Sequence, residues 1–319
     1  MPLRVAVQMD PIEAVGIAGD STFALMLKAQ LLGHRLFHYL ASDLTYEDGR
    51  VRAPAREVTV QRLEDNHFDA SDPAVIDLGR DVDVVLMRQD PPFDIAYITA
   101  TYLLERLAGE TLVVNDPRSV RDAPEKLFVL DFARFMPPTL ITRSLAEVDR
   151  FRAAHDEIVL KPLHGNAGAA VFRIGEDGRN LKALAELFLE TWPEPFIAQA
   201  FLPAVTQGDR RIILVDGEVA GAINRVPAQG EIRSNLAAGG RAEAVELDDR
   251  EREICAALAP ELKRRALLFV GIDVIGGMLT EINVTSPTGI VALDAFNGTD
   301  TPALIWQAIE RRLAERAHG

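Results

Sequence analysis

The sequence predicts a mixed fold class, in which an α/β domain with a doubly wound parallel sheet is followed by an α+β region. Over roughly the first 120 residues, apolar strands alternate with amphipathic helices, which is the pattern of a parallel sheet. The second half instead holds glycine-bearing hairpins, which join antiparallel strands. At 319 residues the chain is too long for one ordinary core, so two or three packed subdomains are expected.

The N-terminal domain is predicted from local signals. Asp20 can cap a helix whose apolar positions recur at helical spacing, and Gly33 ends that helix. Ligands of doubly wound sheets bind beyond the carboxyl ends of the strands, so Asp10 and residues 88–92 are candidate ligand-facing positions. The other predicted elements are strands at residues 3–9, 82–87 and 112–114 and a helix at residues 95–107.

The rest of the chain shows no second parallel domain. Its predicted elements are strands at 158–160, 170–174 and 196–199, a helix at 181–190, a hairpin at 211–223, a helix at 250–265, a second hairpin at 273–283 and a closing helix from Thr301. We therefore divide the chain at residues 1–122, 123–200 and 201–319.

Composition limits the classes of function. With 48% hydrophobic and 26% charged residues, the chain is typical of a soluble globular protein. A formal net charge of −14 argues against nucleic acid or an anionic membrane as the main partner. No apolar run approaches the roughly 20 residues that span a bilayer, and the N-terminus reads as a strand. The lone Cys255 excludes an intrachain disulfide framework, so a cytoplasmic protein is expected.

The second hairpin is the most informative stretch of the chain. Glu281 and Asn283 are two residues apart, so on a strand their side chains point to one face. A three-residue loop at 276–278 would place Asp273 directly opposite Glu281, and we predict this loop because a one-residue slip moves every side chain to the other face. Two carboxylates and an amide oxygen suit Mg²⁺. The alternative is a solvated acidic hairpin edge.

A second candidate site is the loop that follows Lys161, which carries Gly165 and Gly168. A lysine and glycine-rich backbone after a strand can surround phosphate oxygens, although the sequence lacks the GxxxxGK[ST] pattern of a Walker loop. The alternative is an ordinary hairpin loop with a solvated lysine, and this loop taken alone favours the alternative. Lys126 is a further lysine, unremarkable by itself.

Arginines gather in the C-terminal third, at Arg211, Arg225 and Arg233. Arginine recognises carboxylate and phosphate groups bidentately. Arg233 lies in the glycine-bounded segment 226–241, which could close over a substrate as a lid. The alternative is a solvated surface loop.

Seven short strings along the chain form a further pattern: MDPI (9–12), MRQDPPFD (87–94), ATYLLER (100–106), EKLF (125–128), LKPL (160–163), SNLAAGGR (234–241) and TEINVTSPT (280–288). Taken in order, they resemble the ATP-grasp superfamily, and more closely the bacterial glutathione synthetases. The last two strings and MRQDPPFD are specific to this family.

The resemblance implies an ATP-grasp fold in which residues 123–200 and 201–319 form two nucleotide-binding lobes behind a substrate domain. It implies that ATP phosphates contact Lys126, Lys161 and the loop with Gly165 and Gly168. The hinge that packs against adenine would be Gln199, Ala200, Phe201 and Leu202. One departure is Ala167, where the family usually has glycine, which puts loop mobility or nucleotide affinity in doubt.

The resemblance also implies the remaining roles. Two Mg²⁺ (or Mn²⁺) ions would be held by Asp273, Glu281 and Asn283, and the transferred phosphoryl group and the acyl substrate by Arg211 and Arg225. The lid would contain Arg233 and the substrate-binding residues Asn235, Gly239 and Gly240. The peptide and glycine pocket would be bordered by Thr285, Ser286 and Pro287.

The activity implied is the ATP-dependent joining of γ-glutamylcysteine to glycine through an acyl phosphate, by a homotetramer or dimer that needs neither nucleic acid nor membrane. Two alternatives stay open from sequence. One is another ATP-grasp carboxylate–amine ligase, such as one that joins two D-alanines or adds glutamate. The other is a non-catalytic, synapsin-like ATP-binding module.

Overall fold

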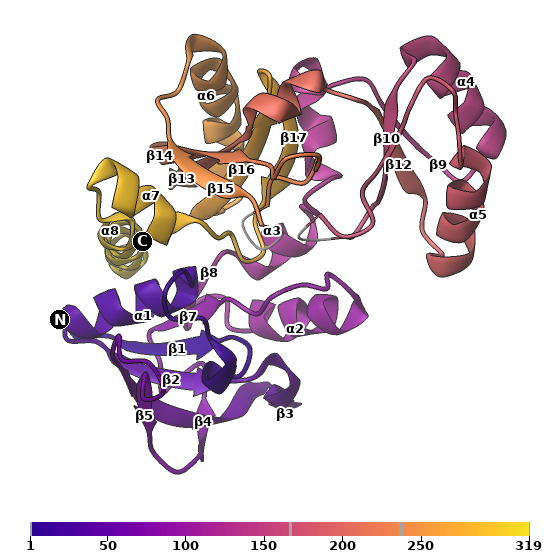
Figure 1. The fold of residues 1–319 in the computed structure, drawn as a ribbon. Coiled ribbons are helices and arrows are strands. Elements are labelled where there is room, and N and C mark those ends of the chain that lie inside the picture. The colour runs from indigo at the N-terminus through magenta and orange to yellow at the C-terminus, as the bar shows by residue number, and fades with distance from the viewer. Residues whose placement is uncertain (1, 166–167, 236–238, 319) are drawn as a thin grey trace.

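The computed structural model describes residues 2–165, 168–235 and 239–318, and this part of the chain folds into three sheets with helices around them (Figure 1). The first sheet lies in the N-terminal domain. A middle lobe with the second sheet projects to one side of the third, C-terminal sheet (Figure 1).

The predicted parallel sheet is confirmed as the centre of the N-terminal domain. Alternate residues of β1 face opposite cores: Val5 and Val7 pack with α1, whereas Ala6 packs with α2 and α3. Asp20 caps α1 by accepting a hydrogen bond from the Phe23 amide, as predicted. The parallel strands are β1 (Arg4–Gln8), β2 (Arg35–Tyr39), β7 (Val84–Met87) and β8 (Leu112–Val114), and the helices are α1 (Ser21–Leu31), α2 (Ile95–Glu105) and α3 (Pro117–Arg121), with one-turn helices η1 (Ile12–Ala14) and η2 (Ala41–Asp43) between them.

The sheet continues into antiparallel strands that the sequence interpretation did not assign. The path of the sheet is β3-β4-β2-β1-β7-β8, and β5 and β6 also pair with β4. The additional strands are β3 (Thr45–Glu47), β4 (Arg50–Val60), β5 (Phe68–Ala70) and β6 (Ala74–Asp77). Asp48 and Gly49 both have positive φ between β3 and β4, which is the hairpin turn that an Asp-Gly pair favours.

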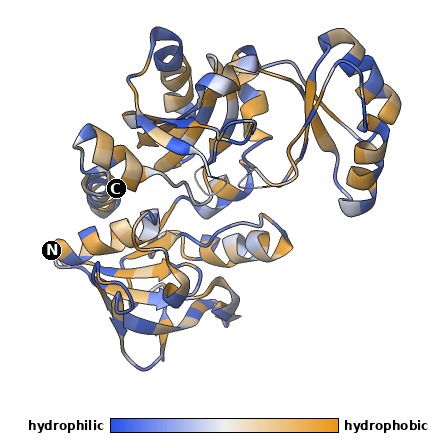
Figure 2. Ribbon diagram, viewed as in Figure 1, coloured by the Kyte–Doolittle hydropathy of each residue, from blue (hydrophilic) through white to orange (hydrophobic). Residues whose placement is uncertain are grey.

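The middle lobe has a hydrophobic core of its own, in which Phe151, Phe188 and Phe196 are buried. Its helices carry apolar residues on one side and polar residues on the other (Figure 2). The strand predicted at 170–174 starts only at Phe172, because Ala170 has a φ of 54°. The order of the sheet is β11-β10-β12-β9, and the elements are β9 (Thr139–Thr142), α4 (Leu145–His155), β10 (Ile158–Pro162), β11 (Phe172–Ile174), α5 (Leu181–Thr191) and β12 (Phe196–Ala200).

The C-terminal sheet is antiparallel, in the order β15-β14-β13-β16-β17. Its first hairpin, which was predicted at 211–223, turns at Asp216-Gly217. The elements are η4 (Pro203–Gln207), β13 (Asp209–Val215), β14 (Glu218–Val226), β15 (Arg241–Ala244), α6 (Asp249–Arg264), β16 (Phe269–Ile275), β17 (Met278–Asn283), α7 (Ile290–Asn297) and α8 (Thr301–His318).

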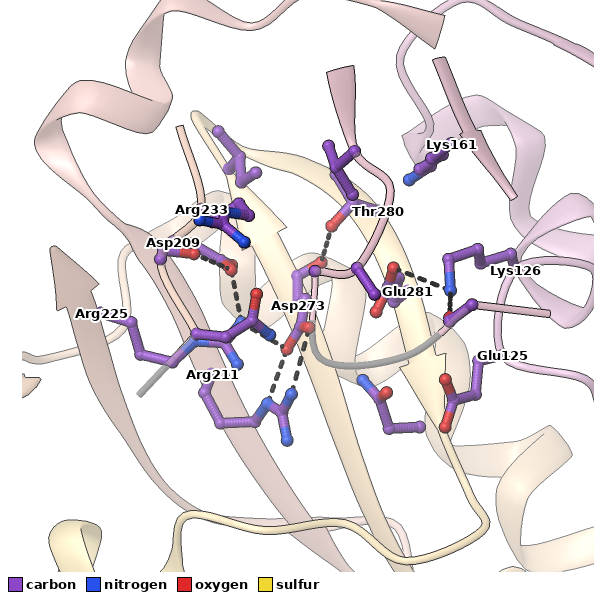
Figure 3. A pocket seen from close by; sticks show the side chains of 18 of the residues that line it. Glu125, Lys126, Lys161, Asp209, Arg211, Arg225, Arg233, Asp273, Thr280 and Glu281 are labelled. Atoms are coloured by element: carbon purple, nitrogen blue, oxygen red, sulfur yellow. Dashed lines mark hydrogen bonds and ion pairs between the residues drawn. The ribbon is translucent and has the colours of Figure 1, made fainter. Parts of the chain in front are cut away.

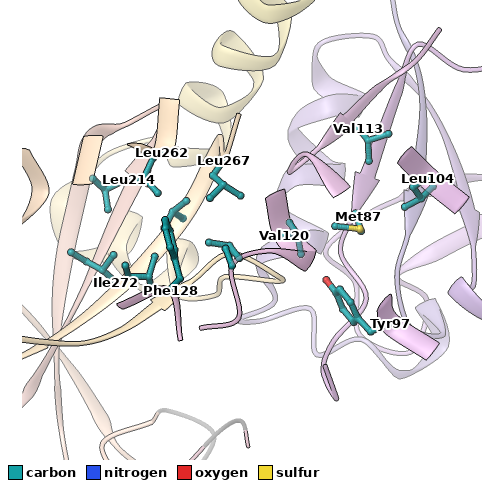
Figure 4. Packing of buried hydrophobic residues seen from close by; sticks show 14 of the residues in the cluster. Met87, Tyr97, Leu104, Val113, Val120, Phe128, Leu214, Leu262, Leu267 and Ile272 are labelled. Carbon is teal, nitrogen blue, oxygen red and sulfur yellow. The ribbon is translucent and has the colours of Figure 1, made fainter. Parts of the chain in front are cut away.

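Two hydrophobic cores join the N-terminal domain to the C-terminal sheet. In one, Val120 and Phe128 lie between Met87 of the N-terminal sheet and Ile272 of the C-terminal sheet (Figure 4). The segment η3 (Phe128–Phe135) belongs to this core and contacts β17. The division at residues 122 and 200 stays a prediction. None of the helices within the described residues has the length and apolar character needed to cross a membrane.

The β16–β17 hairpin corrects one prediction and confirms another. The turn is the two-residue Gly276-Gly277, with φ of 56° and 74°, and Ile275 pairs with Met278, so the predicted three-residue loop is wrong. Asp273 nevertheless pairs with Glu281, because a β-bulge follows Asp273 and shifts the register by one residue. Positive φ at both glycines is what a tight two-residue turn requires.

Candidate active site

A cavity of about 380 Å³ opens where the middle lobe, the C-terminal sheet and the N-terminal domain meet (Figure 3). Its predicted lining residues are Lys126, Lys161, Gly165, Gly168, Gln199, Ala200, Phe201, Leu202, Arg211, Arg225, Arg233, Asn235, Asp273, Glu281, Asn283, Thr285, Ser286 and Pro287. In the described structure Gly239 and Gly240 do not line it. Ala167 and the stretch 236–238 lie outside the described residues.

The hairpin presents its three oxygen-bearing side chains to the cavity. Glu281 and Asn283 alternate with buried Ile282 on β17, and Asp273 faces them from β16. The buried Asn283 side chain leaves its Nδ2 without a hydrogen-bond partner among the described residues. No three His, Cys, Asp or Glu side chains of the described chain form a metal cluster, so a cation here would take two carboxylates, one amide and ligand oxygens. That donor set fits Mg²⁺ bound together with phosphates.

Asp273 is held by both predicted arginines. Arg211 donates from Nε at 2.6 Å and from Nη2 at 3.1 Å, and Arg225 Nη2 lies 3.0 Å from the same carboxylate (Figure 3). All three side chains are buried. Burial opposes ionisation, but the two guanidinium groups outweigh it and lower the pKa of Asp273 to about 2. One of its four lone-pair positions is left for another ligand.

Asp209 was missed by the sequence interpretation. It opens β13, pairs with Arg225, and accepts a hydrogen bond of 2.7 Å from the Ser234 hydroxyl. Its Oδ1 has no partner among the described residues, and burial raises the pKa of this carboxyl to about 6 although Arg225 opposes the rise. Ser234 is only 4% exposed, so Asp209 ties the segment 226–241 to the arginine cluster.

The two predicted lysines approach from different elements. Lys126 precedes η3, donates to the Gly165 carbonyl, and lies 3.4 Å from Glu281 Oε1. Burial lowers the pKa of Lys126, but the Glu281 and Glu125 carboxylates reverse the effect and hold it above the ordinary value. The side-chain ammonium of Lys161 on β10 makes no hydrogen bond or ion pair with any described residue, and burial lowers its pKa. Its ammonium is thus available to a ligand in the cavity.

Glu125 is a second residue that the sequence interpretation passed over. Its carboxylate accepts a hydrogen bond of 3.0 Å from Thr285, and its carbonyl accepts one from the Ile282 amide. Desolvation raises the pKa of Glu125, while the neighbouring Lys126 opposes the rise. These contacts fix the start of the loop at 285–287 against β17.

The middle lobe closes the cavity with an apolar edge. Gln199 pairs with Val159 across β12 and β10, and its side-chain amide donates to Thr139 at 2.8 Å. Phe201 and Leu202 continue the same wall. A flat aromatic ring can pack on such an edge while backbone groups bind its rim.

The glycine loop and the segment 226–241 meet over the cavity. Gly168 has a φ of +73°, and a Cβ built there would lie 2.7 Å from Asn235 Oδ1 and 3.4 Å from Arg233 side-chain carbons. Arg233 Nε lies 3.3 Å from Glu231. The Gly240 amide donates to the Asn235 carbonyl at 3.1 Å, which closes this segment on itself.

Comparison with known proteins identifies the family. The model described as prokaryotic glutathione synthetase, ATP-grasp domain, matches residues 125–298, and the model of the prokaryotic glutathione synthetase N-terminal domain matches residues 3–121. The chain belongs to the prokaryotic glutathione synthetase family. A glutathione synthetase of Rhodopseudomonas palustris is 56% identical over 98% of this chain and 100% of its own length. One from Agrobacterium fabrum is 53% identical over 97% of each chain.

More distant relatives carry the same name. A glutathione synthetase of Yersinia pestis is 44% identical over 98% of this chain and 99% of its own. Membership in this family makes the protein an ATP-dependent ligase that uses Mg²⁺ or Mn²⁺.

Solved structures share the fold at low identity. The crystal structure of the D-cycloserine synthetase DcsG superposes with a TM-score of 0.68 at 19% identity, covering 97% of this chain and 99% of that chain. The ATP-grasp ligase PsnB gives a TM-score of 0.61 at 19% identity over 99% of both chains. This likeness shows the ATP-grasp fold alone, and the predicted fold class is confirmed.

Proposed function

We propose that this protein joins γ-L-glutamyl-L-cysteine to glycine at the expense of ATP, and releases glutathione, ADP and phosphate. In the first step, an oxygen of the cysteinyl carboxylate attacks the γ-phosphorus of ATP and displaces ADP, which gives an acyl phosphate. In the second, the amine of glycine attacks the acyl carbon and forms the C–N bond. The C–O bond to the phosphate breaks, its electron pair leaves with phosphate, and the nitrogen loses a proton. Activation is needed because a carboxylate and an ammonium ion form an unreactive salt.

One observation carries the proposal. Two lysines, two buried arginines and the Asp273–Glu281–Asn283 group all face one cavity, although they are spread over the chain from residue 126 to residue 283. Such a set suits the transfer of a phosphoryl group between two oxygens, where alignment and charge stabilisation do most of the work.

Each residue type has a task in this scheme. Lys126 and Lys161 bind phosphate oxygens. Arg211 and Arg225 hold the acyl substrate and the phosphoryl group, and Asp273 fixes the orientation of both guanidinium groups. When bound by Asp273, Glu281 and Asn283, Mg²⁺ or Mn²⁺ neutralises the charge that develops on the phosphate oxygens.

The segment 226–241 serves as the lid. Water must be kept from the acyl phosphate, because hydrolysis would waste the ATP. The Ser234–Asp209 hydrogen bond holds the lid against the arginines, and the absence of a side chain at Gly168 leaves room for Asn235 beside the phosphate loop. Adenine packs on the wall at residues 199–202, and the peptide lies along the loop 285–287.

We also propose that the enzyme works in the cytoplasm as a homodimer or homotetramer, with small molecules rather than nucleic acid or membrane as its partners. The net charge of −14 supports the exclusion of polyanionic partners. Light scattering of the purified protein at several concentrations tests the assembly.

The decisive experiment measures phosphate release with ATP, Mg²⁺, γ-glutamylcysteine and glycine, and omits each in turn. Phosphate should appear only in the complete mixture, in equal amounts with glutathione. Pairs of D-alanine, or glutamate as acceptor, serve as comparison substrates. Faster turnover with one of those pairs, or Mg·ATP binding without ADP formation under any pair, would contradict the proposal.

A further inference from the structure

Asp90 forms a part of the cavity wall that the scheme above does not use. It follows β7, at the carboxyl end of the parallel sheet, and it lines the same cavity as the arginine cluster. The chain continues from β1 to β2 on one side of the sheet and from β7 to β8 on the other side. The gap between β1 and β7 is therefore the topological switch point, where doubly wound folds bind their ligands. The position that topology predicts for a ligand thus coincides with an acidic side chain.

The charge of Asp90 is not neutralised by a direct partner. Its backbone amide donates to Asp10 Oδ2 at 2.8 Å, which brings two carboxylates together. Within residues 2–165, 168–235 and 239–318, no lysine, arginine or histidine forms an ion pair with either of them. Desolvation and the Asp10 charge raise the pKa of Asp90, although Arg88 and Ser286 oppose the rise. A cationic ligand group would relieve this repulsion.

Arg88, two residues before Asp90, is not among the described residues that line the cavity, but it provides an independent observation. It is 5% exposed, and its Nε and Nη2 donate to two uncharged acceptors, Thr22 Oγ1 at 3.0 Å and the Pro287 carbonyl at 2.9 Å. Its Nη1 has no partner among the described residues. A buried guanidinium without a carboxylate partner is costly, and a nearby ligand anion would stabilise its charge.

Asp90 and Asp273 have different charged neighbours, although both line the same cavity. The charges that act most on Asp90 are those of Asp10, Arg88 and Asp20, all from the N-terminal domain. Those that act most on Asp273 are Arg211 and Arg225. In the proposed reaction the reacting carboxylate lies beside Arg211 and Arg225, so Asp90 faces another part of the bound peptide.

We propose that Asp90 binds the α-ammonium group of the γ-glutamyl residue, and that the field of Arg88 stabilises the adjacent α-carboxylate. The free amino-acid end is the part of the substrate that distinguishes a γ-linked glutamyl peptide from an ordinary acyl-cysteine, so Asp90 acts as a specificity-determining residue. This inference rests on the proposed function.

The test compares γ-glutamylcysteine with N-glutarylcysteine, which has the same length and carboxylates but no ammonium group. The wild-type protein should prefer γ-glutamylcysteine by about tenfold or more in kcat/KM, as the loss of a charge-assisted hydrogen bond predicts. In Asp90→Asn this preference should fall by about tenfold, while kcat/KM for glutarylcysteine and KM for ATP stay within about threefold of wild type.

The matched control is Asp72→Asn, which removes one exposed carboxylate from the same domain outside the cavity and should keep the full preference. Equal use of both peptides by the wild type would overturn the inference without any variant. An unchanged preference in Asp90→Asn, or equal losses on both peptides, would do the same. If Asp90→Asn raised only the KM for glycine, Asp90 would belong to the glycine-binding site, and the inference would be overturned. If the wild type makes no glutathione at all, the proposed function itself fails, which the first measurement shows separately.

Discussion

The replacement Asp273→Asn tests the central ion cluster. The amide keeps the shape of the side chain but removes its charge, so Arg211 and Arg225 lose their shared carboxylate and Asp209 is the remaining buried partner. We expect the variant to be less stable than wild type when both are measured without metal or nucleotide. We also expect it to show no ligase activity when ATP, metal and substrates are supplied.

The size of the effect follows from the structure in two ways. A carboxyl whose pKa falls from 3.8 to about 2 on folding contributes roughly 2 kcal/mol at neutral pH. Removal of one partner from a buried ion pair costs about 3–5 kcal/mol. The free energy of unfolding should therefore fall by roughly 2–5 kcal/mol. Because the folded pKa of Asp273 is depressed, the contribution is present above the unfolded pKa and is lost as pH falls toward 2, about half of it by pH 3.

Urea denaturation followed by circular dichroism gives the free energies at pH 7 and at lower pH. Glu147→Gln is the control, because it breaks only an exposed ion pair with Arg150 and should change stability by less than about 0.5 kcal/mol. A variant at Asp273 as stable as wild type at pH 7, or a stability difference that does not shrink as the pH falls, would refute the reasoning.

Three further predictions concern the hairpin, the lid and the phosphate loop. Glu281→Ala should abolish turnover while circular dichroism shows a folded protein; near-normal activity rules out its metal role. Ser234→Ala removes the hydrogen bond to Asp209, so more ADP than glutathione should form as water reaches the acyl phosphate; a ratio that stays at one contradicts the lid assignment. Gly168→Ala forces positive φ on alanine and a close contact with Asn235, which costs roughly 1 kcal/mol and should raise KM for ATP about fivefold; an unchanged KM means that the loop relaxes freely.

The elements that were predicted correctly carry their signals locally. Asp20 and Asp94 each accept a hydrogen bond from the amide three residues later, so a capping residue beside an apolar repeat was enough to locate α1. The Asp216-Gly217 turn sets the first hairpin of the C-terminal sheet in the same way. Where a short segment determines its own geometry, one sequence is sufficient.

The antiparallel strands of the N-terminal domain were missed for the opposite reason. The stretch 50–60 alternates charged and small residues and contains Pro54, which lowers its strand propensity. It is a strand because β2, β3, β5 and β6 all pair with it. Those partners are set by tertiary packing, which local propensity does not report.

The site shows both limits. The family strings located Lys126, Lys161 and the hairpin. Glu125 lies within one of those strings and Asp209 lies outside all of them, and neither residue has a pattern of its own. Their roles come from burial against Arg225 and Thr285, and these contacts appear only in three dimensions. The β16–β17 hairpin shows the same division. The pairing of Asp273 with Glu281 was predicted correctly from the requirement that one face be buried, but a bulge achieves this pairing with a shorter turn than the one predicted.

The charges of the cavity give a last prediction. Among the described residues that line it, five side chains are formally positive and five negative, so the cavity is close to neutral in a chain with a net charge of −14. The free nucleotide tetra-anion would meet Asp273 and Glu281 directly, whereas the same nucleotide with divalent cations would not. Calorimetry should therefore show that ATP binds at least about 100-fold more weakly in excess EDTA than with Mg²⁺, a difference of roughly 3 kcal/mol. Glu281→Gln should reduce this dependence, because it removes one repelling charge and one ligand together. Equal affinity for free ATP and Mg·ATP would mean that Lys126 and Lys161 alone hold the phosphates, and that the acidic hairpin binds no cation.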